Sequence, residues 1–220
     1  RTIDRKTYYQ YDRAYEMIDK YQPQAVIFSD GGPGCRWVGN ENGFAGATNW
    51  SFLRAGEVYP GYPKYRELQY GHADGNQWVA AECDVSIRPG WFYHPEEDDR
   101  VKTVDQLTDL YYRSVGHNAT LLLNFPVDRD GLIHPVDSAN AVNFHKNIQK
   151  QLAHNLLSGV VAKVSDERGG KYTAKAMTDN DYDTYWATND GVVSATVEFD
   201  LPQPEKVNRM MLQEYIPLGQ

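Results

Sequence analysis

The chain has 220 residues, of which 41% are hydrophobic and 24% charged, a composition typical of an ordinary globular protein with one large or two modest domains. Its formal net charge of −8 argues against nucleic acid and anionic membranes as partners, because polyanions require clustered Lys and Arg. No apolar run approaches the roughly 20 residues that a membrane-spanning helix needs.

The first third of the chain reads as a helix, a short strand and a long loop region. Apolar and aromatic residues at three- and four-residue spacing predict a helix over 5–21, which Pro23 ends. Residues 25–29 read as a short buried strand. Residues 31–77 are rich in Gly, Pro and aromatic residues without periodicity, which is typical of a functional loop region.

Two further strands and two helices follow in the chain. The segments "QWVAAECDV" and "ATLLLNFPVD" read as strands. Between them, Thr103 and Gln106 form a capping-box pattern at the start of a helix over 103–116, and a second helix is predicted over 137–156. Continuous apolar strands that alternate with helices indicate an α/β fold with a parallel sheet.

The pattern changes after Gly159. The segments "SATVEFDL" and "VNRMMLQEYI" alternate as half-buried antiparallel strands do, which predicts the start of a β-sandwich. A complete sandwich uses roughly 100 residues, so the predicted one is truncated. We therefore expect an α/β domain over 1–157 and a partial antiparallel β-sandwich over 158–220.

The N-terminus reads as a polar helix and not as a signal peptide, which leaves export open; we expect a periplasmic or secreted location. Cys35 and Cys83 are too few for a disulfide framework or a zinc quartet, and we expect two free thiols. The aromatic content of 13% lies largely in loops, where flat rings suit sugars or simply pack the loops.

Two carboxylates draw attention because they stand at or near the ends of predicted strands. Asp30 follows the first strand and Glu82 lies late in the second. In parallel α/β barrels these strand ends face the active site. Two carboxylates about 5 Å apart suit a retaining glycosidase, in which one attacks the anomeric carbon and the other transfers protons. An acid after a strand also serves as a turn residue or helix cap, so the position alone leaves both interpretations open.

Three blocks carry a more specific signal: "VIFSDGGPGCRWVGNENG", "WVAAECDVSIRPGWFYH" and "GHNATLLLNFPVDRDGLIHPVD". Together they resemble the α-L-fucosidases of glycoside hydrolase family 29, most of all the branch that cleaves α-1,3- and α-1,4-linked fucose. The resemblance implies a retaining exo-glycosidase with Asp30 as nucleophile and Glu82 as general acid/base. It implies fucosylated oligosaccharides as substrates and no metal or other cofactor in catalysis.

The loops beside the two carboxylates offer candidates for contact with the sugars beyond the fucose. Charged and amide side chains could grip these sugars, and aromatic rings could stack on them. Packing in the core or stapling of a loop is the alternative for each. The candidates are Arg36, Trp37, Asn40, Glu41, Trp91 and Tyr93. Gly31 and Gly32 could let a sugar approach the nucleophile, since they lack a Cβ.

The chain departs from the family in length. An eight-stranded barrel needs about 250 residues, whereas only three strand candidates precede the sandwich. We therefore expect residues 1–157 to be the C-terminal portion of a (β/α)8 TIM barrel. The missing N-terminal barrel half would then be a partner, and an inactive fragment is one alternative. A non-catalytic glycan-binding protein is another, although a lectin has no need for both carboxylates.

The segment "KAMTDNDYDTYWATNDG" resembles the loop region of discoidin-like modules related to family 32 carbohydrate-binding modules, which often hold a structural calcium ion. Asp179, Asp181 and Thr184 offer closely spaced oxygen donors of the kind that Ca²⁺ prefers. Turns rich in Asp and Asn have the same pattern without metal, so both interpretations stay open.

Overall fold

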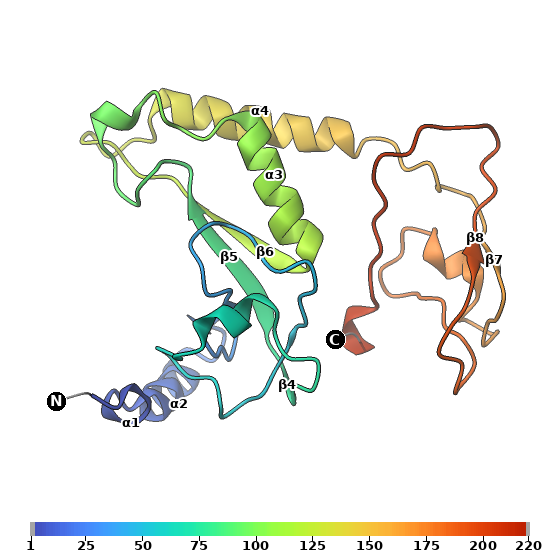
Figure 1. Ribbon diagram of the computed structural model, residues 1–220, viewed down its shortest axis with the longest axis horizontal. Helices are drawn as coiled ribbons and strands as arrows, with labels where there is room; N and C mark the ends of the chain where they lie inside the picture. The colour runs from blue at the N-terminus through green and yellow to red at the C-terminus, as the bar shows by residue number, and fades with distance from the viewer. Residues whose placement is uncertain (1–2, 219–220) are drawn as a thin grey trace. The chain divides into compact units, whose positions relative to one another are not determined.

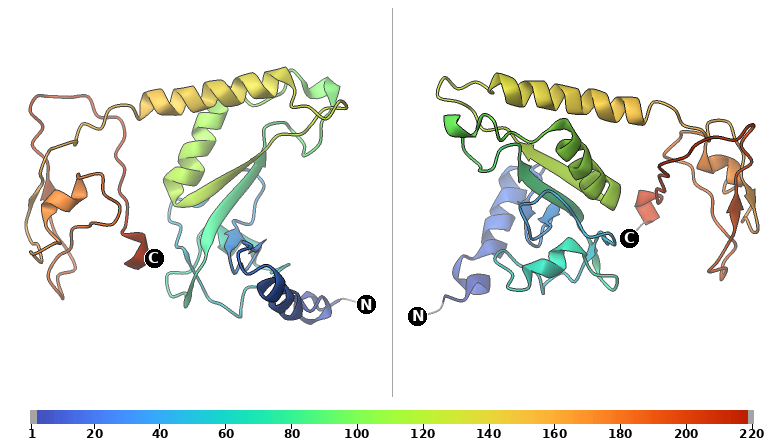
Figure 2. Two further views of the ribbon diagram at one scale, coloured as in Figure 1. Left: turned by 180° about the vertical axis from the view of Figure 1, so that it is seen from behind. Right: turned by 45° about the horizontal axis from the view of Figure 1, so that its top comes forward.

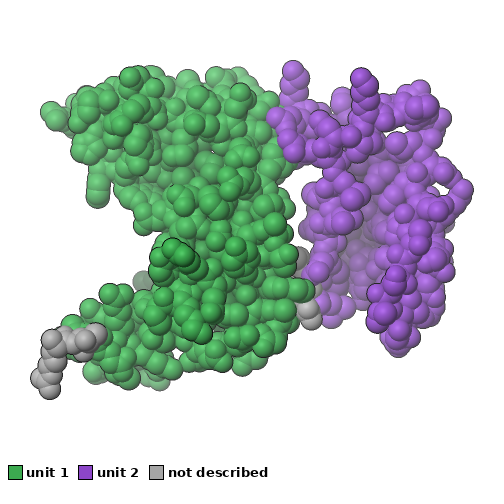
Figure 3. Space-filling model, viewed as in Figure 1, with its two compact units in different colours: residues 1–148, 220 green, residues 149–219 purple. Residues whose placement is uncertain are grey.

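The computed structural model describes residues 3–218, which form two compact units (Figure 3). The first unit extends to Ile148 and the second begins at Gln149. The division falls within helix α4 (Pro135–Gln151), whereas the sequence analysis placed a boundary after residue 157.

A parallel sheet of four strands, in the order β1–β2–β5–β6, forms the centre of the first unit. Figure 1 shows strands β5 and β6 side by side. The predicted parallel α/β arrangement is thus confirmed for this sheet, although strand β2 lies inside the segment predicted to be a loop. The strands are β1 (Phe28–Ser29), β2 (Cys35–Trp37), β5 (Ala80–Ser86) and β6 (Ala119–Asn124).

The predicted buried strand over 25–29 is largely wrong. Only Phe28–Ser29 pairs with β2, and the side chain of Val26 is 74% exposed. An apolar run predicts burial only if something covers it, and nothing in residues 3–218 covers Val26.

Helices α3 (Val104–Ser114) and α4 lie on the same side of strands β5 and β6 (Figure 2). Leu107 and Leu110 of α3 pack with Val85 and Ile87 in the largest apolar cluster, against which Phe144 of α4 also packs. The hydrophobic effect therefore fixes these helices to one face of the sheet.

The start of α3 confirms the predicted capping box. The Thr103 side chain accepts a hydrogen bond from the backbone N–H of Gln106 at 3.3 Å, and the Gln106 side chain accepts one from the Thr103 N–H at 2.9 Å. These bonds satisfy two N–H groups that a helix start would otherwise leave unpaired.

The predicted N-terminal helix is divided in two, α1 (Arg5–Tyr8) and α2 (Tyr11–Tyr21). Gln10 between them has a φ of +51°, a left-handed conformation that an α-helix cannot contain. The spacing of apolar residues predicted the extent of the helical segment correctly but gave no sign of this break.

Short elements complete both units. The loop region of the first unit contains an antiparallel pair, β3 (Phe52–Leu53) and β4 (Gln77–Trp78). The second unit contains the antiparallel pair β7 (Lys163–Val164) and β8 (Val197–Glu198). Single 3₁₀ turns are η1 (Tyr65–Gln69), η2 (Pro95–Glu97), η3 (Val115–His117), η4 (Ala174–Met177) and η5 (Ile216–Leu218).

The two strands predicted for the second unit are realised only in part. Of the first, only Val197–Glu198 is a strand, and 207–216 contains no strand. Met210, Met211 and Leu212 are 77–84% exposed. An alternating segment becomes a strand only when a neighbour pairs with its backbone, and residues 3–218 supply none here. No helix in that range is long and apolar enough to cross a membrane.

Candidate active site

The two faces of strand β5 carry different kinds of side chain. Cys83 and Val85 are buried in apolar clusters, Val85 against Leu107 of α3. Because successive side chains of a strand point to opposite faces, Glu82 and Asp84 lie on the face turned away from α3. Two carboxyl groups therefore share one face of the central sheet.

Sheet register places the two predicted catalytic residues at the same level. Ser29 of β1 pairs with Arg36 of β2, which pairs with Ala81 of β5. Asp30 and Glu82 each follow this row by one residue. Glu82 lies nearer the middle of β5 than its end. Because β1 is short and ends at Ser29, Asp30 nevertheless lies at the same level of the sheet as Glu82.

Asp30 is held by the backbone of a distant loop. Its Oδ2 accepts hydrogen bonds from the N–H groups of Gly61 at 2.7 Å and Tyr62 at 3.1 Å. A Cβ on Gly31 would lie 2.8 Å from the carbonyl oxygen of Val58 in the same loop. Gly31 therefore admits this loop, and not a sugar as the sequence suggested.

The loop that holds Asp30 is itself fastened by a partly buried polar cluster. The hydroxyl group of Tyr62 donates to Glu67 Oε2 at 3.2 Å, and His72 Nε2 lies 3.4 Å from the same oxygen. The backbone N–H of Arg54 donates a hydrogen bond to His72 Nδ1. The His72 ring therefore carries its proton on Nε2, from which it donates a hydrogen bond to Glu67. Sequence analysis missed this cluster because nothing in an aperiodic loop signals which residues will meet.

Glu82 has the environment of a carboxylic acid that keeps its proton. The residue is 5% exposed, and within residues 3–218 neither carboxyl oxygen has a hydrogen-bond partner. Burial, followed by the negative charge of Asp84, raises the pKa of Glu82 to about 7. A general acid needs such a pKa, because it must still be protonated near neutral pH.

Asp84 has a hydrogen-bond donor that Glu82 lacks. The indole Nε1 of Trp37 donates to Asp84 Oδ1 at 2.7 Å, and the Trp37 ring stacks on Tyr65 with 6.4 Å between centroids. Burial raises the pKa of Asp84 above its ordinary value, and the hydrogen bond from Trp37 offsets part of this rise. Asp84 was not predicted as a site residue, although its spacing of two from Glu82 places both on one face.

The buried carboxyl group of Glu82 predicts a pH-dependent stability. An exposed Glu has a pKa near 4.5, so between that pH and about 7 the folded state binds this proton more tightly than the unfolded state. Wild-type stability should therefore fall as pH rises through this window. The side chain introduced by Glu82→Gln cannot ionise. The free energy of unfolding of this variant, relative to that of wild type, should therefore rise by roughly 2 kcal/mol between pH 4.5 and pH 8. Urea unfolding at both pH values measures this, and an equal difference at both would contradict it.

Arg36 has a structural position instead of the predicted sugar contact. Its side chain is completely buried. The guanidinium group donates to the carbonyl oxygens of Leu68 at 3.0 Å, Val79 at 2.7 Å and Trp50 at 2.8 Å, and to Asn49 Oδ1. The alternative of a loop staple therefore describes Arg36 better, because a fully buried group cannot reach a sugar.

Glu41 and Trp91 are brought together from separate loops. The Trp91 indole donates to Glu41 Oε2 at 3.0 Å. Asn40, in contrast, secures its own turn, since its side chain donates to the Phe44 carbonyl at 3.1 Å and accepts from the Asn42 N–H at 3.0 Å. Glu41 and Trp91, but not Asn40, are therefore placed to contact a ligand as a pair.

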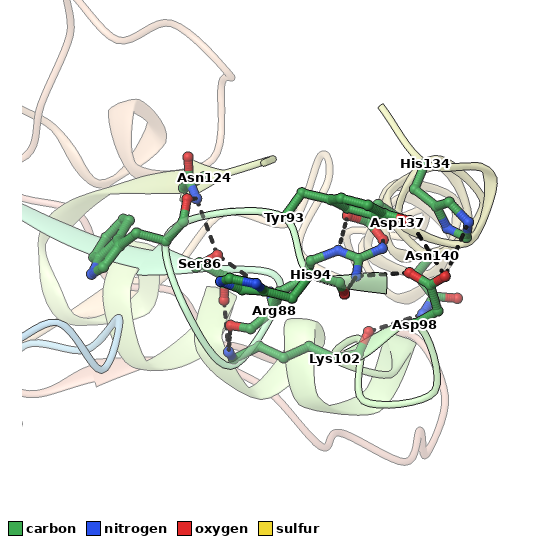
Figure 4. A network of polar contacts seen from close by, with 11 residues as sticks. Ser86, Arg88, Tyr93, His94, Asp98, Lys102, Asn124, His134, Asp137 and Asn140 are labelled. Atoms are coloured by element: carbon green, nitrogen blue, oxygen red, sulfur yellow. Dashed lines mark hydrogen bonds and ion pairs between the residues drawn. The ribbon is translucent and has the colours of Figure 1, made fainter. Parts of the chain in front are cut away.

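Tyr93 belongs to a buried network at the end of β5 (Figure 4). Arg88 forms a two-pronged ion pair with Asp137 of α4, with bonds of 2.8 and 2.9 Å, and both side chains are completely buried. The guanidinium group also lies 2.9 Å from Asp98 and 4.6 Å from the centre of the Tyr93 ring. The network ties the loop after β5, which carries Trp91, to the start of α4.

The predicted calcium ligands form a local turn. Asp179 accepts hydrogen bonds from the backbone N–H of Asp181 at 2.9 Å and from the hydroxyl group of Thr184 at 2.7 Å. These bonds lower the pKa of Asp179. Among the described residues, no three His, Cys, Asp or Glu side chains are grouped to hold a metal ion. The arrangement fits a turn stabilised by its own side chains, and calcium stays a prediction.

The thiol groups of Cys35 and Cys83 are both free, as predicted. Burial and the nearby charge of Glu82 raise the pKa of both, for Cys83 to about 12. Neither thiol is therefore a nucleophile near neutral pH.

A carboxyl group held by backbone N–H groups and a buried acid with a raised pKa, at one level of the same sheet, are the kind of groups that glycoside hydrolases use. No protein-family model matches the chain. Alpha-L-fucosidase 1 of Arabidopsis thaliana is 36% identical to it over 220 residues, which cover 96% of this chain and 42% of that protein.

Solved structures agree with this comparison. The crystal structure of SpGH29 matches with a TM-score of 0.82 at 30% identity, over 89% of this chain and 42% of that one. The GH29 fucosidase E1_10125 of Ruminococcus gnavus, in complex with fucose, matches with a TM-score of 0.76 at 31% identity, over 87% and 40%. The homologues and structural neighbours of this chain are thus α-L-fucosidases of glycoside hydrolase family 29. The chain spans about two fifths of the length of the curated relatives that it matches.

Proposed function

We propose that this chain supplies the two catalytic carboxyl groups of a retaining exo-glycosidase that removes terminal α-L-fucose, α-1,3- or α-1,4-linked, from oligosaccharides or glycoconjugates. The observation that carries the proposal is the contrast between Asp30, held by two backbone N–H groups, and Glu82, buried without a partner, at one level of the same sheet. The two environments suit different roles, because backbone N–H groups orient Asp30 while burial raises the pKa of Glu82 to about 7.

The proposed reaction follows from these two states. Asp30 attacks the anomeric carbon through Oδ1, while Oδ2 stays bound to Gly61 and Tyr62. At the same time Glu82 gives its proton to the departing glycosidic oxygen, and a fucosyl–Asp30 ester forms. Glu82, now ionised, takes a proton from water as that water attacks the same carbon, which releases fucose and restores both groups.

The remaining parts of the proposal concern what surrounds the pair. Glu41 and Trp91, joined by a hydrogen bond, lie on loops next to the sheet and would contact the sugars beyond the fucose. The four-stranded sheet would be part of a (β/α)8 barrel, so activity is assigned to the full-length protein. A periplasmic or secreted location and a discoidin-like second unit stay predictions.

Glu82→Gln tests the proposal, because the two classes of substrate depend differently on an acid. On natural fucosides, whose leaving groups are poor, kcat/KM should fall about 10²- to 10⁴-fold. On aryl fucosides with activated leaving groups, formation of the ester needs little protonation of the leaving oxygen. On these substrates kcat/KM should therefore fall by about tenfold or less. Steady-state kinetics of the full-length protein on both substrates measures the difference.

Glu96→Gln is the matched control, since the Glu96 side chain is 73% exposed and lies on the loop after β5. It should leave both substrates unaffected. Equal losses on both substrates in Glu82→Gln would remove Glu82 from the acid role.

The retaining course requires that the first product detected by NMR is α-fucose, and that the two carboxyl groups lie about 5 Å apart in the intact enzyme.

A further inference from the structure

Two carboxyl groups on one face of β5 have opposite surroundings. Glu82 and Asp84 are separated by one residue, so their backbone positions lie about 7 Å apart along the strand. Glu82 is enclosed without a hydrogen bond, whereas Asp84 accepts one from the Trp37 indole at 2.7 Å. Trp37 thus gives Asp84 a side-chain donor that Glu82 lacks among the described residues.

The donor is built into the sheet. Trp37 is the residue of β2 that pairs with Glu82, and its ring is stacked on Tyr65 of the turn η1. These two constraints hold the indole N–H toward Asp84. A hydrogen bond to a carboxylate favours its charged form, so Asp84 ionises in preference to Glu82.

Few other charges act on this face of the sheet. Strand β6 presents Thr120, Leu122 and Asn124 there, none of which titrates. The thiols of Cys35 and Cys83 are protonated at neutral pH, and Arg36 lies among the backbone carbonyls of buried loops. Glu41 acts on Asp84, and Asp30 follows β1. After burial, the negative charge of Asp84 is the influence that raises the pKa of Glu82.

We propose that Asp84 is a positioning residue for the proton: its negative charge, stabilised by Trp37, keeps the Glu82 carboxyl group protonated until the leaving oxygen takes the proton. The inference rests on the proposed function, in which Glu82 is the general acid. Ionisation of Glu82 would place a second charge beside Asp84 in a buried site, which is unfavourable in a medium of low dielectric constant.

Asp84→Asn in the full-length protein tests the inference. The amide oxygen of the new side chain can still accept the Trp37 hydrogen bond, so the variant loses the charge with little change in shape. The basic limb of the kcat/KM profile reports the pKa of the free acid, which in wild type should lie near pH 7. Without the neighbouring charge, Glu82 ionises more readily, and the limb should move about one pH unit lower. At pH values above this limb, kcat/KM of Asp84→Asn on natural fucosides should be about tenfold lower than that of wild type.

Two companion variants make the result specific. Trp37→Phe removes the donor, so Asp84 takes a proton more easily and the limb should move in the same direction by a smaller amount; this variant also serves if Asp84→Asn does not fold. Asp109→Asn, at an exposed α3 position that pairs with Arg113 across one helical turn, should leave the limb in place.

The outcomes separate the inference from the proposed function. If Glu82→Gln abolishes the basic limb but Asp84→Asn and Trp37→Phe leave its position unchanged, the role of Asp84 is wrong and that of Glu82 stands. If Glu82→Gln leaves the limb intact, Glu82 is not the acid and both fall. A lower limb in Asp84→Asn, absent from Asp109→Asn, supports the role of Asp84.

Discussion

Asp30→Asn should reduce kcat of the full-length protein roughly 10⁴-fold or more on all fucosides, natural or aryl, because a neutral amide cannot form the fucosyl ester. The fold should survive, since the amide oxygen can still accept the N–H groups of Gly61 and Tyr62. The loss of charge from these bonds should reduce stability by about 1 kcal/mol. Kinetics and urea unfolding of the same variant measure both effects.

A direct observation of the ester complements the kinetics. Rapid quenching of the wild-type reaction followed by peptide mass spectrometry should find a fucosyl group on the peptide that contains Asp30. Asp74→Asn is the control for Asp30→Asn and should keep its activity, because Asp74 is 69% exposed and accepts a hydrogen bond from Arg54 on the surface. A variant at Asp30 that keeps a tenth of wild-type activity would exclude this residue as nucleophile.

The second large effect concerns stability and lies in the network of Figure 4. Asp137→Ala would leave the Arg88 guanidinium group buried without its two-pronged partner. Loss of one partner of a buried pair reduces stability by about 3–5 kcal/mol, which is a large part of the stability of a typical domain. Asp98 still contacts Arg88 but is 35% exposed, so we expect it to compensate only in part. Urea unfolding at neutral pH should show a loss in this range.

Asp98→Ala provides the matched comparison, because Asp98 contacts the same Arg88 but is 35% exposed. Its loss should be about 1 kcal/mol or less, since water partly replaces the missing charge. The double variant Arg88→Met, Asp137→Leu should be more stable than Asp137→Ala alone, because it removes both charges of the fully buried pair. Equal losses for Asp137→Ala and Asp98→Ala would show that burial does not decide the strength of these pairs.

Features that depend on neighbours in the chain were predictable from the sequence. The capping box of Thr103 and Gln106 is one example, since both partners lie within a single turn of helix. The parallel sheet was predictable because continuous apolar strands between helices have few other arrangements. The position of Asp30 at the end of β1 was predictable for the same reason.

Features that depend on contacts between distant segments were not predictable. Strand β2 forms only because β1 and β5 lie on either side of three residues in a glycine-rich segment. Arg36 was a candidate for contact with a sugar, yet loops from residues 49 to 79 enclose it. The segment 207–216 alternates like a strand but lacks a neighbouring strand to pair with.

The sequence by itself determined which acids are present, where helix α3 begins and that the central sheet is parallel, because capping and strand pattern are local properties. Only the tertiary structure decided the state of each acid. Glu82 and Asp84 differ little in sequence, but the fold buries one without a donor and brings Trp37 to the other. Protonation depends on burial and on hydrogen-bond partners from other strands, and these exist only after the chain has folded.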